Sequence, residues 1–174
     1  MSKKCRPRLM RVIELTHYGK NGEVLYQDKN LTNIFHTSGE EFILKAIFTG
    51  ETTVPSSYYF GLDDRVSLSA DDTMSTIQTE GDEPATNGYV RQAVASTGEF
   101  SVALIDGINQ AQGPIISFVA VGGDWGPVSN LFLSTKSDNT GYLLASIPLA
   151  QTVTISDGET ISMRMGLSLR DCPL

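Results

Sequence analysis

Alternating apolar and polar residues predict β structure in the C-terminal part of the chain. Residues 160–169 follow a period of two, the pattern of a strand with one face in the core and the other in water. The apolar members are Ile161, Met163, Met165, Leu167 and Leu169. Residues 151–156 alternate in the same way, and Asp157-Gly158 between the two segments is a strong hairpin signal, because glycine adopts a positive φ without strain. The pattern therefore predicts a hairpin over residues 151–169.

Two earlier segments, residues 128–135 and 141–149, are apolar on both faces, which is typical of strands that are central or covered. Residues 137–141 supply turn residues between them. Other strands are predicted at 9–16, 23–27, 58–62, 89–95, 100–105 and 114–121, with turns at 18–22 and at Asp106-Gly107. This succession of short strands favours a sandwich or barrel over a parallel α/β sheet.

One helix is predicted in the first half of the chain. Its apolar stripe consists of Phe42, Ile43, Ala46 and Ile47, which recur at helical spacing. Ser38 and Glu41 fit a capping box at its start, and Gly50 is placed to end it. We expect the stripe to close one mouth or face of the sheet. The acidic segment 63–87, rich in Ser, Thr, Asp and Gly, is predicted as the longest loop, with a short helix around residues 72–77 as a further candidate.

These elements predict a mainly β fold: an antiparallel, jelly-roll-like β-sandwich with one short α-helix and an N-terminal arm. The 174 residues, 40% of them apolar, suffice for one ordinary core, and no linker rich in Pro and Gly divides them. We therefore expect a basic arm over residues 1–11 and a single β-sandwich domain over residues 12–174.

The arm is the one basic part of an acidic chain. Its basic residues are Lys3, Lys4, Arg6, Arg8 and Arg11, whereas the remaining residues hold 8 basic against 20 acidic side chains. The net charge of the whole chain, arm included, is −7. Phosphates attract such an arm, but the acidic body repels nucleic acid and no aromatic platform accompanies the arm. We expect either a solvated tail or an arm that docks on an acidic protein surface, which makes its five basic side chains interface candidates.

The residues offer little for catalysis. His17 and His36 belong to no metal-ligand spacing, and nucleophile-elbow, Walker and dinucleotide-binding motifs are absent from the sequence. Adjacent carboxylates at 63–64, 71–72 and 82–83 could in principle supply a general acid and base, but such pairs are more often solvating charge or a weak Ca²⁺ site. We expect a protein without enzymatic activity, cofactor or catalytic metal.

Trp125, the only tryptophan, lies in the Gly-rich loop 122–127 between two apolar strands. It is a candidate interface anchor, since large amphipathic rings carry much of the binding energy at interfaces. The alternative is that the ring folds back and plugs the end of the sandwich.

Two further features bear on the compartment. Cys5 and Cys172 are expected to be free thiols, because reducing compartments seldom hold structural disulfides, although a pair between them stays open. The sequence has no apolar run long enough to span a membrane and no classical signal peptide. We therefore expect no membrane partner and synthesis in the cytoplasm.

Four phrases of the sequence resemble small virion structural proteins of tailed bacteriophages. They are residues 58–65, 87–94, 122–133 and 161–169. The resemblance implies a virion component without catalytic residues, made in the host cytoplasm, that binds other virion proteins and forms homo-oligomers.

Within that class we expect a capsid decoration, or cement, protein that binds the major capsid protein on the outside of the head. A tail-fibre or tail-adaptor protein is the alternative, disfavoured because the sequence shows no shaft repeats or heptads. A carbohydrate-binding module is a remoter alternative that requires an aromatic-lined groove near Trp125, Tyr58 and Tyr59.

Overall fold

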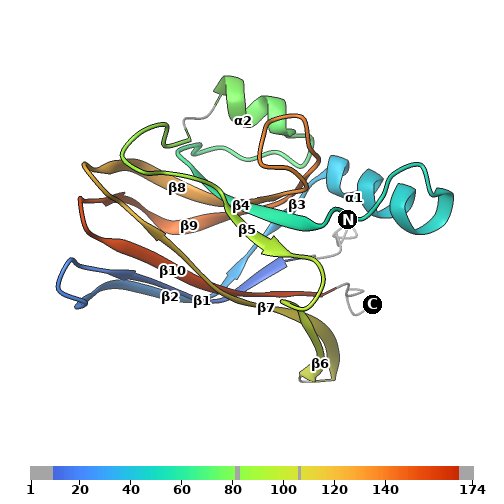
Figure 1. The fold of residues 1–174 in the computed structure, drawn as a ribbon, viewed down its shortest axis with the longest axis horizontal. Helices are drawn as coiled ribbons and strands as arrows, with labels where there is room; N and C mark the ends of the chain where they lie inside the picture. The colour runs from blue at the N-terminus through green and yellow to red at the C-terminus, as the bar shows by residue number, and fades with distance from the viewer. Residues whose placement is uncertain (1–9, 81–82, 106, 169–174) are drawn as a thin grey trace, which may run out of the picture.

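The structure, a computed structural model, describes residues 10–80, 83–105 and 107–168. Its strands form two antiparallel five-stranded sheets that pack face to face (Figure 1). The first sheet contains, in spatial order, β2 (Val24–Thr32), β1 (Met10–Tyr18), β10 (Thr160–Leu167), β7 (Ile108–Val119) and β6 (Ser101–Ile105). The second contains β3 (Ile34–Phe35), β9 (Leu143–Ile155), β8 (Trp125–Ser134), β4 (Ser57–Asp63) and β5 (Gln92–Ala95). The predicted antiparallel β-sandwich is confirmed.

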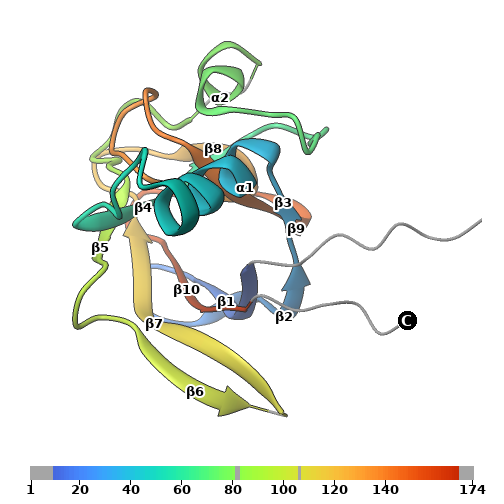
Figure 2. The same cartoon turned by 90° about the vertical axis from the view of Figure 1, so that its right-hand side faces the viewer.

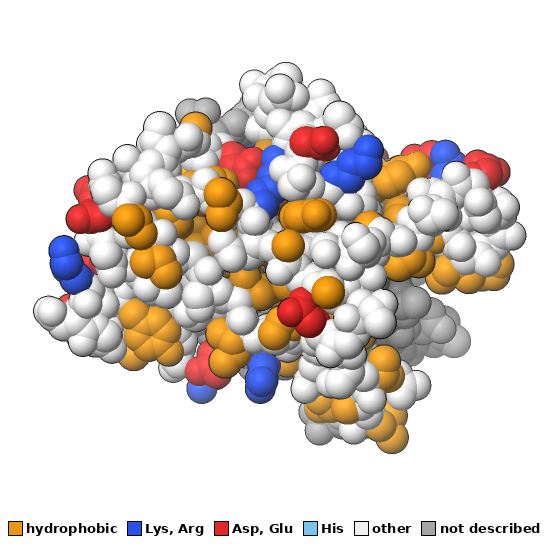
Figure 3. Space-filling view, viewed as in Figure 1, with side chains coloured by type: hydrophobic (Ala, Val, Ile, Leu, Met, Phe, Trp, Pro, Cys, Tyr) orange, Lys and Arg blue, Asp and Glu red, His pale blue; other side chains and the backbone are white. Residues whose placement is uncertain are grey.

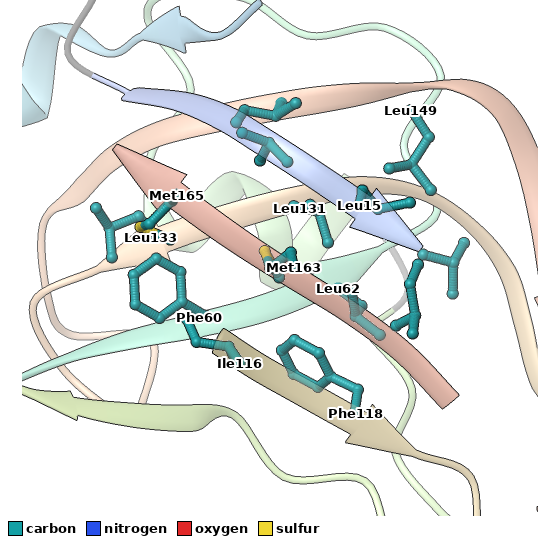
Figure 4. Close-up of a cluster of buried hydrophobic side chains, with 14 of the residues drawn as sticks. Leu15, Phe60, Leu62, Ile116, Phe118, Leu131, Leu133, Leu149, Met163 and Met165 are labelled. Carbon is teal, nitrogen blue, oxygen red and sulfur yellow. The ribbon is translucent and has the colours of Figure 1, made fainter. Parts of the chain in front are cut away.

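β10 shows why the alternating pattern predicted a strand. Ile161, Met163 and Met165 are at most 2% exposed, whereas Arg164 between them is exposed to solvent. β10 lies between β1 and β7, so its inward side chains meet both neighbours as well as the opposite sheet. Figure 4 shows side chains of the two sheets meeting in this layer, among them Met163 and Leu62. Burial of this shared apolar layer is the main stabilising contribution of the fold.

The predicted hairpin over residues 151–169 is wrong, because β9 and β10 lie in different sheets. The turn at Asp157-Gly158 carries the chain across the sandwich, and the Gly158 N–H donates to the carbonyl of Ala120, the residue after β7. β9 finds its partners in β8 and β3, and β10 finds its partners in β1 and β7. Long-range pairing on both sides of each strand outweighs the local turn signal. β9 also unites the predicted segments 141–149 and 151–156 in one strand.

The predicted hairpin of β1 with β2 is present, and β6 with β7 and β8 with β9 also pair across predicted turns. β7 begins at Ile108, six residues before the predicted start of this strand at residue 114. β1 begins at Met10 and pairs Arg11 with Thr32 and Gly166. Met10 and Arg11, which the sequence analysis placed in the arm, therefore belong to a central strand of the first sheet.

The predicted helix is present as α1 (Thr37–Leu44), extended by the π-helical segment η1 (Lys45–Thr49). The expected capping box is wrong: the N-cap is His36, and the Ser38 hydroxyl donates to the carbonyl of Leu143 on β9 instead. Gly50 ends the helical segment with φ 67°, as predicted. α1 thus starts where it can bond to β9, a contact that its own sequence does not reveal.

Gly39 lets α1 approach β9 closely, since a Cβ at this position would lie 2.6 Å from the carbonyl oxygen of Leu144. We expect Gly39→Ala to destabilise the domain by about 1–3 kcal/mol, although alanine favours the helix itself by about 1 kcal/mol. Urea unfolding measures the difference. Glu40→Ala, at the exposed neighbouring position of the same turn, is the control and is expected to change stability by less than about 0.5 kcal/mol. A stabilised Gly39→Ala variant would contradict the close packing.

The long segment between β4 and β5 contains the short helix α2 (Met74–Glu80), near the predicted position. Met74 and Ile77 of α2 form a second small core with Phe132 of β8 and Leu143 of β9, on the outer face of the second sheet (Figure 1). This cover explains why β8 is apolar on both faces. Among the described residues, none of the helices is long and apolar enough to cross a membrane.

Candidate interaction surface

The basic arm lies almost entirely outside the described residues. Lys3, Lys4, Arg6 and Arg8 precede residue 10, and of Arg11 only the backbone, in β1, is described. The docking of these five side chains on an acidic surface therefore stays a prediction. Cys5 and Cys172 also lie outside the described residues, so the expectation that they are free thiols stays a prediction.

Trp125 is the first residue of β8 and is only 3% exposed. Its indole N–H donates to the carbonyl of Asn87 at 3.0 Å, and its ring meets the ring of Tyr89 edge to face, with centroids 5.3 Å apart. The structure matches the alternative in which the ring plugs the end of the sandwich. The role of Trp125 as an interface anchor stays a prediction, and it would require the indole ring to leave this buried position.

A hollow of about 290 Å³ lies beside Trp125, lined by Asp64, Glu83, Asp124 and loop residues. Within residues 10–80, 83–105 and 107–168, no three His, Cys, Asp or Glu side chains are grouped as they would be to hold a metal ion. Tyr59 pairs with Ser134, at the opposite end of β8 from Trp125. The aromatic groove that a carbohydrate-binding module requires near Trp125, Tyr58 and Tyr59 is therefore not formed by these three rings.

A buried ion cluster around Arg65 fastens the long β4–β5 segment to the second sheet. Arg65 Nη2 lies 2.8 Å from Asp63 Oδ2, and Nη1 lies 3.1 Å from Asp72 Oδ2. The amide of Asn130 donates to Asp63 Oδ1 at 3.0 Å and also to the carbonyl oxygen of Arg65. Burial raises the pKa of Asp63, and the Arg65 guanidinium opposes this shift. Sequence analysis had treated Asp63 and Asp72 as acid–base candidates or solvating charge, whereas both are ion-paired in the interior.

A second arginine fastens the other end of the same segment. The Arg91 guanidinium binds both carboxylate oxygens of Glu83, at 2.7 and 2.8 Å, and donates to the carbonyl of Asp138 at 2.8 Å. Its Cζ lies 5.1 Å from the ring centroid of Phe132, close enough for a cation–π contact. The Tyr89 hydroxyl adds a bond of 2.7 Å to Glu83. The described parts of the acidic segment are therefore held against the sheet at both ends.

His36 is fully buried at the start of α1, and its Nε2 lies 2.7 Å from the Ser146 hydroxyl. Burial lowers the pKa of His36 to about 4; nearby Asp72 opposes the shift and Arg65 adds to it. Between pH 4 and the ordinary value of about 6.5, the unfolded chain binds this proton and the folded chain does not. His36 therefore makes the free energy of unfolding fall as pH falls through this window, by about 2–3 kcal/mol between pH 7 and about pH 4.5.

Urea unfolding of the natural chain and of His36→Asn at these two pH values tests this effect. Because other groups titrate in the same range, the measurement is the difference between the two pH dependences. The variant is expected to lose less stability on acidification than the natural chain. Equal losses in both would contradict the burial of a neutral histidine.

Exposed apolar side chains lie at one end of the sandwich, on α1, η1 and the loop that follows η1. Leu44, Ile47, Phe48 and Val54 are all exposed, and Phe48 is exposed to 76%. Sequence analysis had placed Ile47 in the stripe that faces the sheet, and this is wrong. Phe42 is buried and Ile43 and Ala46 pack against the core, but the wider π-helical turn that starts at Lys45 leaves Ile47 in solvent. We call Leu44, Ile47, Phe48 and Val54 the apolar tip.

The β6–β7 hairpin projects from the same end of the molecule, below the apolar tip (Figures 1 and 2). Val102 and Leu104 of β6 are 75% and 70% exposed. Figure 3 shows hydrophobic side chains on both projections. Sequence analysis recognised β6 as a strand but not that it stands outside the sandwich. The one available signal was the near absence of charge between residues 100 and 119, where Asp106 is the only charged residue.

A family model described as Podophage GP4 fiber I protein gp80 matches residues 35–168 of the chain, well over half of its length. The match begins at β3 and contains α1, the β4–β5 segment, and the β6–β7 hairpin. None of the curated proteins matches the chain.

Proposed function

The chain belongs to the podophage GP4 fiber I protein gp80 family, and from this premise we propose that it is a structural subunit of a fibre on a tailed-phage virion. Family membership makes it a virion structural protein, as the resemblance implied, and such a protein binds other virion proteins. The family description names a fibre, and this is the observation that favours the fibre role over the expected decoration of the capsid.

The ion clusters support a structural rather than a catalytic role. Asp63 and Asp72 share one buried guanidinium, and Glu83 is bound by a second arginine, Arg91. Carboxylates held in this way are poor candidates for catalysis, because their oxygens are already bound by a guanidinium and Asp63 and Asp72 are buried away from any substrate. Their contribution is to keep the β4–β5 segment in place on the sheet.

We propose that the apolar tip is the surface through which the protein attaches to a neighbouring virion protein. Phe48 lies near the end of η1, which continues α1, and α1 is anchored in the core by the buried Phe42. A large exposed ring on a helix anchored in this way can enter a pocket of a partner with less loss of conformational entropy than a ring on a free loop. The basic arm, predicted to dock on an acidic surface, would add a salt-sensitive contact.

Locating the chain in the intact particle tests the fibre role. We expect gold-labelled antibodies against the purified protein, and cryo-electron microscopy of the virion, to place it on fibres that project from the particle. A label distributed over the head would overturn the fibre role in favour of capsid decoration.

Phe48→Ser is expected to weaken attachment to virions by about 2 kcal/mol, or about 30-fold in affinity, because it removes the largest exposed apolar side chain of the tip. Co-sedimentation of the purified variant with particles that lack the protein measures the loss. Val66→Ser, which changes another exposed apolar residue in the β4–β5 segment, is the matched control and is expected to attach normally. Both variants should melt at the temperature of the natural chain. Equal attachment of both would exclude the apolar tip as the docking surface.

A further inference from the structure

β6 is an edge strand of unusual composition. It is the last strand of the first sheet and pairs with β7 along one side only, among the residues that the structure describes. All but the last of its residues are exposed, and the strand has no charged residue, no proline and no register shift. Natural sheets protect their edge strands with charged residues, prolines or β-bulges, since an open apolar edge invites pairing with another chain. β6 has none of these features.

The other three sheet edges of the sandwich are protected. β2, at the opposite edge of the same sheet, carries Asp28 and Lys29. The edges of the second sheet are β3, which has two residues, and β5, which has four. Short strands offer little backbone for pairing. Of the four edge strands, β6 is therefore the one that is neither charged nor shorter than five residues.

The backbone geometry of the hairpin identifies the groups that are free to pair. Ile105 and Ile108 face each other across the two-residue loop, and in such a loop the flanking residues exchange both of their backbone hydrogen bonds. Because hydrogen-bonded and non-hydrogen-bonded pairs alternate along an antiparallel ladder, the N–H and C=O groups of Val102 and Leu104 point away from β7. The same two residues carry the exposed apolar side chains.

We propose that β6 of one molecule pairs, antiparallel, with β6 of a second copy of this chain. Centred on Ala103, this pairing sets Val102 of each copy opposite Leu104 of the other, so that four backbone hydrogen bonds and two apolar pairs form together. The spacing is self-complementary, as a two-fold contact requires. Since β6 carries no charge, two copies of a chain with net charge −7 meet there without opposing like charges.

Pairing of this kind joins the first sheets of two molecules into one continuous sheet. A contact between two five-residue strands is small, and small contacts correspond to weak association, with dissociation constants on the order of 10–100 µM. The proposal goes beyond the fibre role, because it concerns the contact between copies and holds wherever the protein lies in the particle.

Sedimentation equilibrium of the purified full chain, at concentrations from about 1 to 500 µM, tests the association. We expect a monomer–dimer equilibrium, weakened at least about tenfold by Leu104→Lys, which places a charge at the edge. Val66→Lys, at a residue that is 91% exposed and lies in the β4–β5 segment, is the control and should dimerise like the natural chain. A chain that stays monomeric throughout, or a dimer that Leu104→Lys leaves intact, would overturn the proposal.

Disulfide cross-linking tests the register. In the proposed pairing the two copies of Ala103 face each other as a non-hydrogen-bonded pair, with Cα atoms about 4.5 Å apart, which suits a disulfide. With Cys5 and Cys172 changed to serine, Ala103→Cys should therefore form an oxidised dimer at least about tenfold faster than Ser101→Cys. The two copies of Ser101 would lie about 13 Å apart, because each faces Ile105 of the other copy. Equal rates would exclude the register centred on Ala103.

Discussion

Arg65→Ala is expected to destabilise the domain by about 3–5 kcal/mol, a large part of the stability of an ordinary domain. The substitution removes the only cation of the cluster from Asp63, which is fully buried, and from Asp72, which is nearly so. Each carboxylate then has to ionise without its partner or take up a proton, and both outcomes cost free energy in the interior. Urea unfolding monitored by Trp125 fluorescence measures the loss.

Lys29→Ala is the matched control for this experiment. Lys29 and Glu14 also form an ion pair, with Nζ and Oε1 3.9 Å apart, but both side chains are about half exposed. Solvent screening makes such pairs nearly neutral, so we expect a change below about 0.5 kcal/mol. If both variants lose little stability, the Arg65 cluster contributes far less to holding the β4–β5 segment than its burial indicates.

Met163→Asp is expected to prevent folding into a soluble domain. Met163 is 2% exposed in β10, between β1 and β7, and faces the apolar layer between the two sheets. An unpaired carboxylate there costs several kcal/mol in addition to the lost apolar burial, which together approach the whole stability of a domain. Expression in the soluble fraction and far-UV circular dichroism report the outcome.

Arg164→Ala, one residue further along the same strand, tests the facing of β10. Its side chain is exposed on the outer face of the sheet, so we expect the variant to fold and to unfold with the free energy of the natural chain within about 0.5 kcal/mol. A soluble, stable Met163→Asp variant, or an equally damaging Arg164→Ala, would show that the strand does not face the core as described.

The sequence predicted the strands well where one face is buried, because alternation records burial directly. It failed at Asp157-Gly158, since a glycine with φ 86° at residue 158 serves a hairpin and a crossing between sheets equally well. Only the distant partners β1, β7 and β8 decide between the two, and they are not local information. The capping box failed for the same reason: Ser38 has a better acceptor on β9 than in its own helix.

The candidate site was less accessible to prediction. Apolar patterns identify residues that are suited to burial, but they do not say whether the partner surface belongs to the same chain. Ile47, Val102 and Leu104 are residue types that usually form a core, and yet they are exposed.

The ion cluster was not predicted, because Asp63 and Arg65 are residue types that usually lie on the surface. Only the folded structure brings Asp72 to Arg65 and Asn130 to Asp63. Trp125 was the exception. One of the two positions considered for its ring, folded back into the end of the sandwich, matches the structure.

The pairing of Met10 with Leu167 sets how this domain would respond to mechanical load. β1 enters the first sheet and β10 leaves it at the same end of two neighbouring antiparallel strands. A force that pulled these two ends apart would open the ladder one hydrogen bond at a time, like a zipper, and would not strain all of its bonds together as shear does. Such a connection yields at low force. If the chain is the fibre subunit proposed above, tension would therefore pass through lateral contacts between whole domains, and not through the polypeptide from the start of β1 to the end of β10.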